Sequence, residues 1–337
     1  MAQHSPIDPS LVVAGITLPH AAILAPMSGV SDLPFRRAVR RCGGGLVVTE
    51  MVASAAVLQQ VRVEMRKLKT TALEEAPISI QLAGWDPQIM AEAAKLCEGL
   101  GASFIDINMG CPAKKVTGKL SGSALMRDPK LAAAIMQAVK SAVRVPVTVK
   151  MRLGWDDTCL NAAEFGRIAE NAGLSMLAVH GRTRCQMYTG DANWHKIAAV
   201  VDAVSIPVIA NGDIRCADTA MQAMAASGAA GVMVGRGAQG RPWLLAQIGD
   251  VLAGRKMRAA PSIRARHELM RVHLDDMITH YGPVAMRLAR KHIAWYAHGL
   301  PGAAELRDIA NNTTDAKTVF AAVDQFFQKL YTDTQAA

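Results

Sequence analysis

Eight short apolar runs of strand length recur along the first 240 residues, and segments with a helical pattern separate them. The runs start about 23 to 43 residues apart. They cover residues 21–27, 46–51, 78–84, 104–110, 147–154, 176–183, 208–214 and 231–237. Strand-helix alternation repeated eight times predicts an α/β fold, the parallel (β/α)₈ TIM barrel. A doubly wound open sheet is the competing arrangement, but it would normally carry a glycine-rich turn after its first strand, where this chain reads APMSGVSD.

Local signals at the ends of the helical segments agree with this reading. Two segments begin with Asp-Pro, which pairs an N-cap with proline at the first helical position. These pairs are Asp86-Pro87 and Asp128-Pro129. Other segments end on glycine, as at Gly101, Gly173 and Gly228. Residues 11–19 predict a small hairpin that closes the bottom of the barrel.

The pattern changes after Gly254. Residues 255–262 read as a linker, and no strand-like run follows them. From Ile263 the sequence predicts four helical segments, of which the last two are shorter. We therefore expect a barrel domain over residues 1–254 and a C-terminal all-helical bundle over residues 255–337.

Polar and charged side chains gather at the carboxyl ends of the predicted strands, where TIM barrels place their active sites. They are Pro26, Met27 and Ser28, then Glu50, Met51, Gln81, Asn108 to Cys111, Lys150, Arg152, His180, Arg182, Asn211 to Asp213, Gly235 and Arg236. The strand bodies are apolar by comparison. This contrast predicts an active site at that end of the barrel.

The ends of the last two strands, Asn211-Gly212-Asp213 and Gly235-Arg236, occupy the usual phosphate site of a TIM barrel. Glycines there let backbone N–H groups approach an anion, and an arginine supplies charge. The alternative is that these glycines only form turns.

Three of the strand-end residues are candidates for contact with a ligand. Lys150 points into the barrel mouth, either toward a ligand or into a salt bridge with Glu50 or Asp106, because an unpaired buried ammonium group is costly. His180 is either a core histidine or a ligand contact. Cys111 lies on the loop after the fourth strand and faces the expected site, unlike the other cysteines, which read as packing residues.

Composition and charge narrow the function. The six cysteines show no paired spacing, which argues against a metal site and against disulfides. No apolar run reaches the roughly 18 residues of a membrane helix, and the N-terminus lacks a secretory signal, so we expect a cytoplasmic protein without membrane contact. Net charge is +9, and residues 251–337 carry 12 Lys and Arg against 8 Asp and Glu. The excess favours a polyanionic partner, and Arg287, Arg290 and Lys291 form a basic helical stripe suited to RNA phosphates.

Nine segments together resemble the tRNA-dihydrouridine synthases, particularly the bacterial B type. They are APMSGVSDLPFR, TEM, QLAG, DINMGCPAKK, VTVKMRLGW, VHGRT, IPVIANGDI, GVMVGRGAQGRPW and ARKHIAWY, and they span nearly the whole chain in the family's order. The chain departs from the usual pattern in SDLPFR, where TDxPFR is commoner, and at Ser28, where many members have alanine.

The resemblance implies FMN as cofactor and assigns residues to it. Pro26, Met27 and Ser28 match the segment against the flavin ring. The polar contacts to isoalloxazine and ribityl correspond to Gln81, Asn108, Lys150 and His180. The phosphate cradle corresponds to Asn211, Gly212, Asp213, Gly235 and Arg236, in agreement with the barrel argument above.

The implied reaction reduces the 5,6 double bond of uracil in folded tRNA. NADPH reduces FMN, a hydride passes to carbon 6, and Cys111 protonates carbon 5 as general acid. A thiol suits this task because it is ordinarily protonated at neutral pH, and Lys114 and Lys115 would favour release of its proton. Similarity to the B type favours position 17 of the D-loop.

The sequence also allows two other functions, a small-molecule flavoenzyme and a non-catalytic RNA-binding protein. A flavoenzyme of the dihydroorotate or dihydropyrimidine dehydrogenase kind shares the barrel and the chemistry, but it has no need of a basic C-terminal bundle. A non-catalytic RNA-binding protein on a barrel scaffold has no need of Cys111, Lys150 and the phosphate loops. We also expect a monomer.

Overall fold

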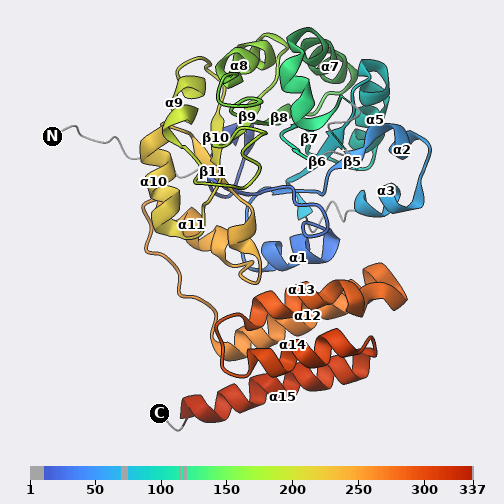
Figure 1. Cartoon of the computed structure of the whole chain (residues 1–337), viewed down its shortest axis with the longest axis vertical. Coiled ribbons are helices and arrows are strands. Elements are labelled where there is room, and N and C mark those ends of the chain that lie inside the picture. Colours follow the sequence, from blue (N-terminus) through green and yellow to red (C-terminus); the bar gives the residue numbers. More distant parts are fainter. Residues whose placement is uncertain (1–10, 70–74, 114–115, 117–119, 336–337) are drawn as a thin grey trace, which may run out of the picture.

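The computed structural model describes residues 11–69, 75–113, 116 and 120–335. Eight parallel strands close into a barrel, which confirms the predicted fold (Figure 1). Its strands are β3 (Ala22–Leu24), β4 (Val47–Val48), β6 (Ile78–Ala83), β7 (Phe104–Met109), β8 (Val147–Arg152), β9 (Met176–His180), β10 (Val208–Asn211) and β11 (Gly231–Val234). The pairing of β4 with β6 and of β3 with β11 closes the ring.

One further strand was not predicted. β5 (Val52–Ala53) follows β4 after a break and pairs with the end of β6. The eight barrel strands begin within one residue of their predicted starts and end one to three residues before their predicted ends. The predicted hairpin is present as β1 (Val12–Val13) and β2 (Ile16–Thr17), which pair antiparallel, and buried side chains of this segment join the barrel core.

Helices surround the barrel. They are α1 (Leu33–Arg41), α2 (Ser54–Leu58), α3 (Arg62–Lys67), α5 (Pro87–Gly99), α7 (Pro129–Ala142), α8 (Ala162–Asn171), α9 (His195–Val201), α10 (Ala217–Ser227) and α11 (Leu244–Leu252), with short 3₁₀ turns η1 (Gly122–Arg127) and η2 (Arg236–Ala238). Both predicted Asp-Pro starts are confirmed. Asp86 accepts a hydrogen bond from the Ile89 N–H at 2.9 Å, and Asp128 accepts one from Leu131 at 3.0 Å.

Four helices follow the linker, as predicted, with a 3₁₀ turn η3 (Gly282–Val284) between the first two. They are α12 (Ile263–Tyr281), α13 (Ala285–Ala297), α14 (Ala303–Asn312) and α15 (Ala316–Gln335). The expectation that the last two are shorter was wrong for α15, which has 20 residues. Its buried positions Val323, Phe327 and Leu330 continue at helical spacing well past the second turn, so packing extends it.

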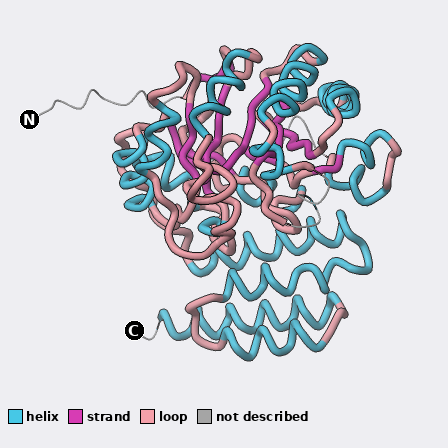
Figure 2. Tube along the Cα trace, turned by 45° about the horizontal axis from the view of Figure 1, so that its top comes forward, coloured by secondary structure: helices cyan, strands magenta, loops and turns pink. Residues whose placement is uncertain are grey.

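These helices have their own hydrophobic cluster and lie beside the barrel at α1 (Figures 1 and 2). The buried ring of Phe35 on α1 packs against the rings of His273 and His292, with ring centroids 5.9 and 5.7 Å apart. Asp276 on α12 pairs with Arg37 and Arg41 of α1. The C-terminal helices are thereby held next to the loop that follows β3.

Candidate active site

A cavity of about 1230 Å³ opens at the carboxyl ends of the strands. All of the barrel residues that the resemblance assigns to the cofactor or to catalysis line it. They are Pro26, Met27, Ser28, Gln81, Asn108, Cys111, Lys150, His180, Asn211, Gly212, Asp213, Gly235 and Arg236. Parallel strands end at the same edge of the barrel, and this brings together residues from widely separated parts of the chain.

A chain of hydrogen bonds crosses the cavity floor from β8 to the Cys111 loop. Both Thr148 Oγ1 and Gln81 Nε2 donate to the buried carboxylate of Asp106, each at 2.6 Å. Asn108 Nδ2 donates to Gln81 Oε1 at 2.7 Å, and the Cys111 N–H donates to Asn108 Oδ1 at 3.0 Å. The carboxylate therefore fixes which way both amides point, and among the described residues no acceptor takes the second N–H of either amide, which leaves it for a ligand.

Lys150 brings positive charge to this floor. Burial, and secondarily the neighbouring Arg152, lower its pKa to about 8. Among the described residues Lys150 forms no ion pair within 4 Å. Of the partners considered from the sequence, Asp106 accepts from Thr148 and Gln81, while Glu50 accepts from the Gly29 N–H at 2.5 Å. The ammonium group is available to an acceptor in the cavity.

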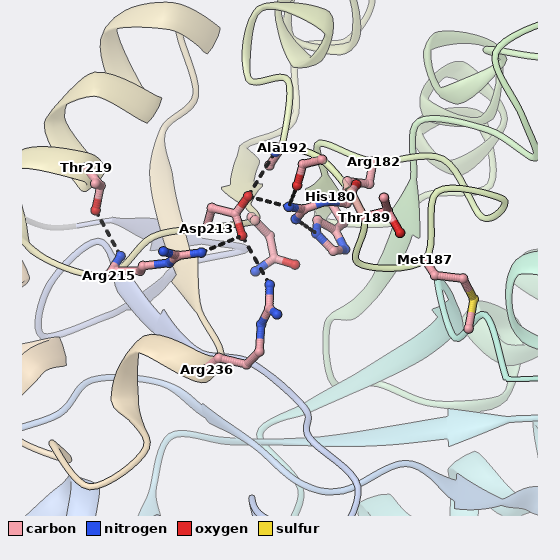
Figure 3. A network of polar contacts seen from close by, with 12 residues as sticks. His180, Arg182, Met187, Thr189, Ala192, Asp213, Arg215, Thr219 and Arg236 are labelled. Atoms are coloured by element: carbon pink, nitrogen blue, oxygen red, sulfur yellow. Dashed lines mark hydrogen bonds and ion pairs between the residues drawn. The ribbon is translucent and has the colours of Figure 1, made fainter. Parts of the chain in front are cut away.

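Asp213 is the centre of an arginine cluster at the ends of β9, β10 and β11 (Figure 3). Its Oδ2 accepts from Arg182 Nη2 at 2.5 Å and from the Ala192 N–H at 2.9 Å. Its Oδ1 accepts from Arg236 Nη2 at 3.1 Å and lies 3.8 Å from Arg215 Nη2. Burial alone would raise the pKa of this carboxyl, but the hydrogen bonds from Arg182 and Ala192 outweigh it and the pKa is lowered. The ionised Asp213 carboxylate therefore binds arginine side chains at the cavity. It is these arginines, and not Asp213, that could bind an anion.

His180 lies beside the same cluster and is uncharged at neutral pH. Burial and the nearby cations Lys150, Arg152 and Arg182 hold its pKa well below the usual range. Its Nε2 lies 3.4 Å from Arg182 Nη1, and since a guanidinium only donates, this nitrogen is the acceptor. The ring presents a neutral polar edge to the cavity.

Gly212 and Gly235, two of the glycines predicted for the site, differ in how much space surrounds them. Gly212 has φ +115°, and an added Cβ would lie 2.6 Å from Ala192 Cβ and 2.7 Å from His180 Cδ2, so its own neighbours exclude any side chain. A Cβ on Gly235 would meet Ala25 and Met27 at an ordinary 3.7 Å. Its neighbours do not require glycine at position 235, but a Cβ there would fill cavity space.

The Cys111 loop is fixed from several sides. Ser123 donates to the Cys111 carbonyl from Oγ at 2.9 Å and from N–H at 3.1 Å. Arg152 Nε donates to the Gly110 carbonyl at 2.9 Å. All six cysteines are free thiols. Lys114 and Lys115, which the sequence suggested as neighbours of this thiol, lie outside the described residues.

The three residues of the predicted RNA-binding stripe differ in their contacts. Arg287 is exposed on α13. Arg290 Nε donates to the Ala310 carbonyl at 3.1 Å, and Lys291 Nζ donates to the Gly29 carbonyl beside the cavity. Two members of the stripe therefore bind backbone oxygens within the protein, and Lys291 links the helices to the loop that carries Met27 and Ser28.

Several functional neighbours were not assigned to the site from sequence. Asp106 lies two residues before the assigned Asn108 on the same face of β7, and this period of two could have identified it as part of the site. Arg182 was recognised only as a strand-end residue, and it follows the end of β9. Tyr188 lines the cavity with the Arg236 guanidinium 4.9 Å from its ring centroid. It stands in a loop whose sequence carries no such periodic signal.

The described residues offer neither a metal site nor a membrane-spanning helix. No group of three or more His, Cys, Asp or Glu side chains is arranged to hold a metal ion there. Nor does any described helix combine the length and apolar character needed to cross a membrane.

Comparison with known proteins gives the family. A family model described as dihydrouridine synthase (Dus) matches residues 23–332. A Rickettsia conorii protein named "Probable tRNA-dihydrouridine synthase" is 49% identical over 316 residues, covering 94% of this chain and 96% of the relative. A Pseudomonas aeruginosa protein named "tRNA-dihydrouridine synthase B" is 48% identical over 313 residues, covering 92% and 94%. The chain belongs to the dihydrouridine synthase family of oxidoreductases.

Proposed function

We propose that this protein is a tRNA-dihydrouridine synthase that reduces the 5,6 double bond of a D-loop uridine with FMN and NADPH, Cys111 acting as general acid. The observation that carries the proposal is the convergence of the Cys111 loop and a set of hydrogen-bond donors on one cavity. Membership of the dihydrouridine synthase family supplies the reaction class.

The donor set fits FMN. Gln81 and Asn108 offer free amide N–H groups and Lys150 an ammonium group, which suit the carbonyl and ring-nitrogen acceptors of a flavin. Gly235 leaves cavity space that a Cβ would fill, and Arg236 supplies charge for a phosphate. Residues of the ring segment would be Pro26, Met27 and Ser28, with His180 among the polar contacts and Asn211, Gly212, Gly235 and Arg236 at the phosphate. Asp213 would act there by holding Arg236.

When bound and reduced by NADPH, FMN would supply the hydride for carbon 6 of uracil. Cys111 donates the proton that carbon 5 requires. General acid catalysis depends on a well-placed proton donor. Ser123 donates to the Cys111 carbonyl and the Cys111 N–H donates to Asn108, and these two hydrogen bonds hold that position before substrate arrives.

The tRNA must present the target base outside its stack, which is easiest in a loop. We assign catalysis to residues 1–254 and tRNA binding to residues 255–337, where exposed Arg287 is the member of the predicted stripe most available to phosphate. Lys291 and Arg290 support the surface from within. Position 17, a monomeric state and a cytoplasmic location stay predictions.

The proposal is tested with Cys111→Ala, studied in flavin-loaded protein by stopped-flow spectroscopy. Reduction by NADPH should keep a near-normal rate, because it needs no proton from this thiol. Reoxidation by unmodified tRNA should slow by roughly 10²- to 10⁴-fold, as expected for loss of a general acid. Heat-denatured wild-type protein should release FMN.

Cys159→Ala is the matched control, since Cys159 is a half-buried free thiol that does not line the cavity. It should reoxidise like wild type. Equal reoxidation rates for Cys111→Ala and wild type would remove Cys111 as the acid. Recovery of FAD would contradict the assigned cofactor.

A further inference from the structure

We propose that Arg127, Trp155 and Arg184 form a binding site for backbone phosphate of the substrate RNA, on barrel loops beside the cavity and opposite the C-terminal helices. The inference rests on the proposed function, because it takes RNA as the substrate. It adds a second RNA-binding surface, which lies on the barrel.

The three residues come from separate loops at the catalytic end of the barrel. Arg127 ends η1, Trp155 follows β8 and Arg184 follows β9. The Arg127 and Arg184 guanidinium carbons lie 4.8 and 4.7 Å from the centroid of the Trp155 ring. Backbone bonds of 2.9 Å, from Arg184 N–H to Gly154 and from Cys185 N–H to Trp155, join the loops after β8 and β9. The indole therefore holds two cations on a fixed support.

The charge of this cluster is balanced only in part within the described residues, where the pKa of Asp156 is lowered mainly by its hydrogen bond from Thr158 and to a smaller extent by the charge of Arg127. Neither guanidinium forms an ion pair within 4 Å of a described carboxylate, and the buried Nε of Arg184 has no hydrogen-bond partner. Asp156, next to Trp155 in sequence, turns its Oδ1 to Thr158, accepting from its N–H at 3.0 Å and its hydroxyl at 2.7 Å. Two like charges over one ring are suited to an anion, for which arginine forms charge-assisted hydrogen bonds.

The position of the cluster favours RNA over a small anion. β8 is four positions from β3 in either direction around the ring, and the C-terminal helices pack at α1, directly after β3 (Figure 1). The cluster therefore lies across the cavity from those helices. It is also continuous with the cavity wall, since Arg152, which lines the cavity, donates to the carbonyl of Thr183 at 2.7 Å, one residue before Arg184. A nucleotide extruded into the cavity leaves flanking phosphates on both sides of the mouth.

The test is the double variant Arg127→Gln/Arg184→Gln, assayed for binding of unmodified tRNA over a range of salt concentrations. Loss of two phosphate contacts should weaken binding and reduce the slope of log K against log salt by about 1.8, since each contact contributes about 0.9. The KM for tRNA should rise while kcat at saturation and flavin content change little. Arg144→Gln is the matched control, because Arg144 is an exposed arginine just before β8, at the opposite end of the barrel.

A second variant separates charge from packing. Arg127→Lys/Arg184→Lys keeps both cations and should keep the wild-type salt slope. If the glutamine double variant fails to fold, exposed Arg127→Gln alone should lower the slope by about 0.9. A wild-type slope in folded, flavin-loaded glutamine variants would show that the stack only stiffens the two loops, and would overturn the inference. Failure of the wild-type protein to reduce tRNA would instead overturn the proposed function.

Discussion

At the scale of single residues, the buried charge of Lys150 lowers stability, while the proposed contact of this residue with flavin favours keeping it. Its pKa falls from 10.5 to about 8, mainly through burial, so the folded chain holds this proton more weakly than the unfolded chain. The charged lysine therefore lowers the free energy of unfolding below pH 8, and this penalty disappears as the pH rises toward 10.5. We expect Lys150→Met to raise the unfolding free energy of flavin-free protein at pH 7 by at most about 3 kcal/mol, and to weaken flavin binding.

Denaturant titrations at pH 7 and pH 9.5 measure the effect. The gain should shrink at the higher pH, where wild-type Lys150 is mostly neutral. Exposed Lys196→Met is the control and should shift stability little at either pH. A gain of the same size at both pH values would point to apolar packing rather than to the buried charge.

At the scale of elements, the helices around the barrel depend on local caps that can be tested individually. The Asp128 carboxylate accepts the Leu131 N–H at the start of α7, and Pro129 occupies the first helical position. Asp128→Ala leaves this N–H without its side-chain acceptor and should lower the free energy of unfolding by about 1 kcal/mol. Urea titration measures the change, and flavin content should be unaffected because α7 contributes no residue to the cavity.

Lys130→Ala on the same turn of α7 is the matched comparison. Lys130 is exposed and makes no cap, so its removal should change stability by less than about 0.5 kcal/mol. Equal losses in the two variants would mean that the cap contributes nothing beyond helix propensity.

At the scale of the whole molecule, the barrel and the C-terminal helices meet at buried histidines that are neutral. Burial lowers the pKa of His273 to about 4 and holds that of His292 well below its usual range. The unfolded chain takes up protons on these rings below about pH 6.5, so their contribution to stability is lost as the pH falls from 6.5 toward 4. Asp32 acts in the opposite sense, because burial raises its pKa to about 6. The readout must therefore compare variants.

We expect His292→Phe to lose less stability than wild type between pH 6.5 and 4.5. The difference should approach about 2 kcal/mol, since one proton corresponds to about 1.4 kcal/mol per pH unit. Thermal or urea unfolding at several pH values measures it, and exposed His298→Gln should follow wild type. Parallel curves for His292→Phe and wild type would show that His292 does not contribute to the pH dependence.

The sequence by itself determined the barrel, the two Asp-Pro helix starts and the assigned residues that meet in the cavity. Each of these depends on local chemistry. Apolar runs of strand length predict buried strands, Asp-Pro predicts a helix start, and the closed parallel topology then brings every strand end to one edge. Asn108, Lys150 and His180 could be assigned together without knowing any distance between them.

Only the tertiary structure decided what those residues contact. Asp213 proved to hold three arginines, and Lys291 proved to bind the carbonyl of Gly29, 262 residues away. β5 formed because the end of β6 offered a partner, and the length of α15 followed from its packing. Trp155 gathered two arginines from different loops. Such contacts depend on how distant segments pack, and no periodicity or turn signal within a short stretch of chain encodes them.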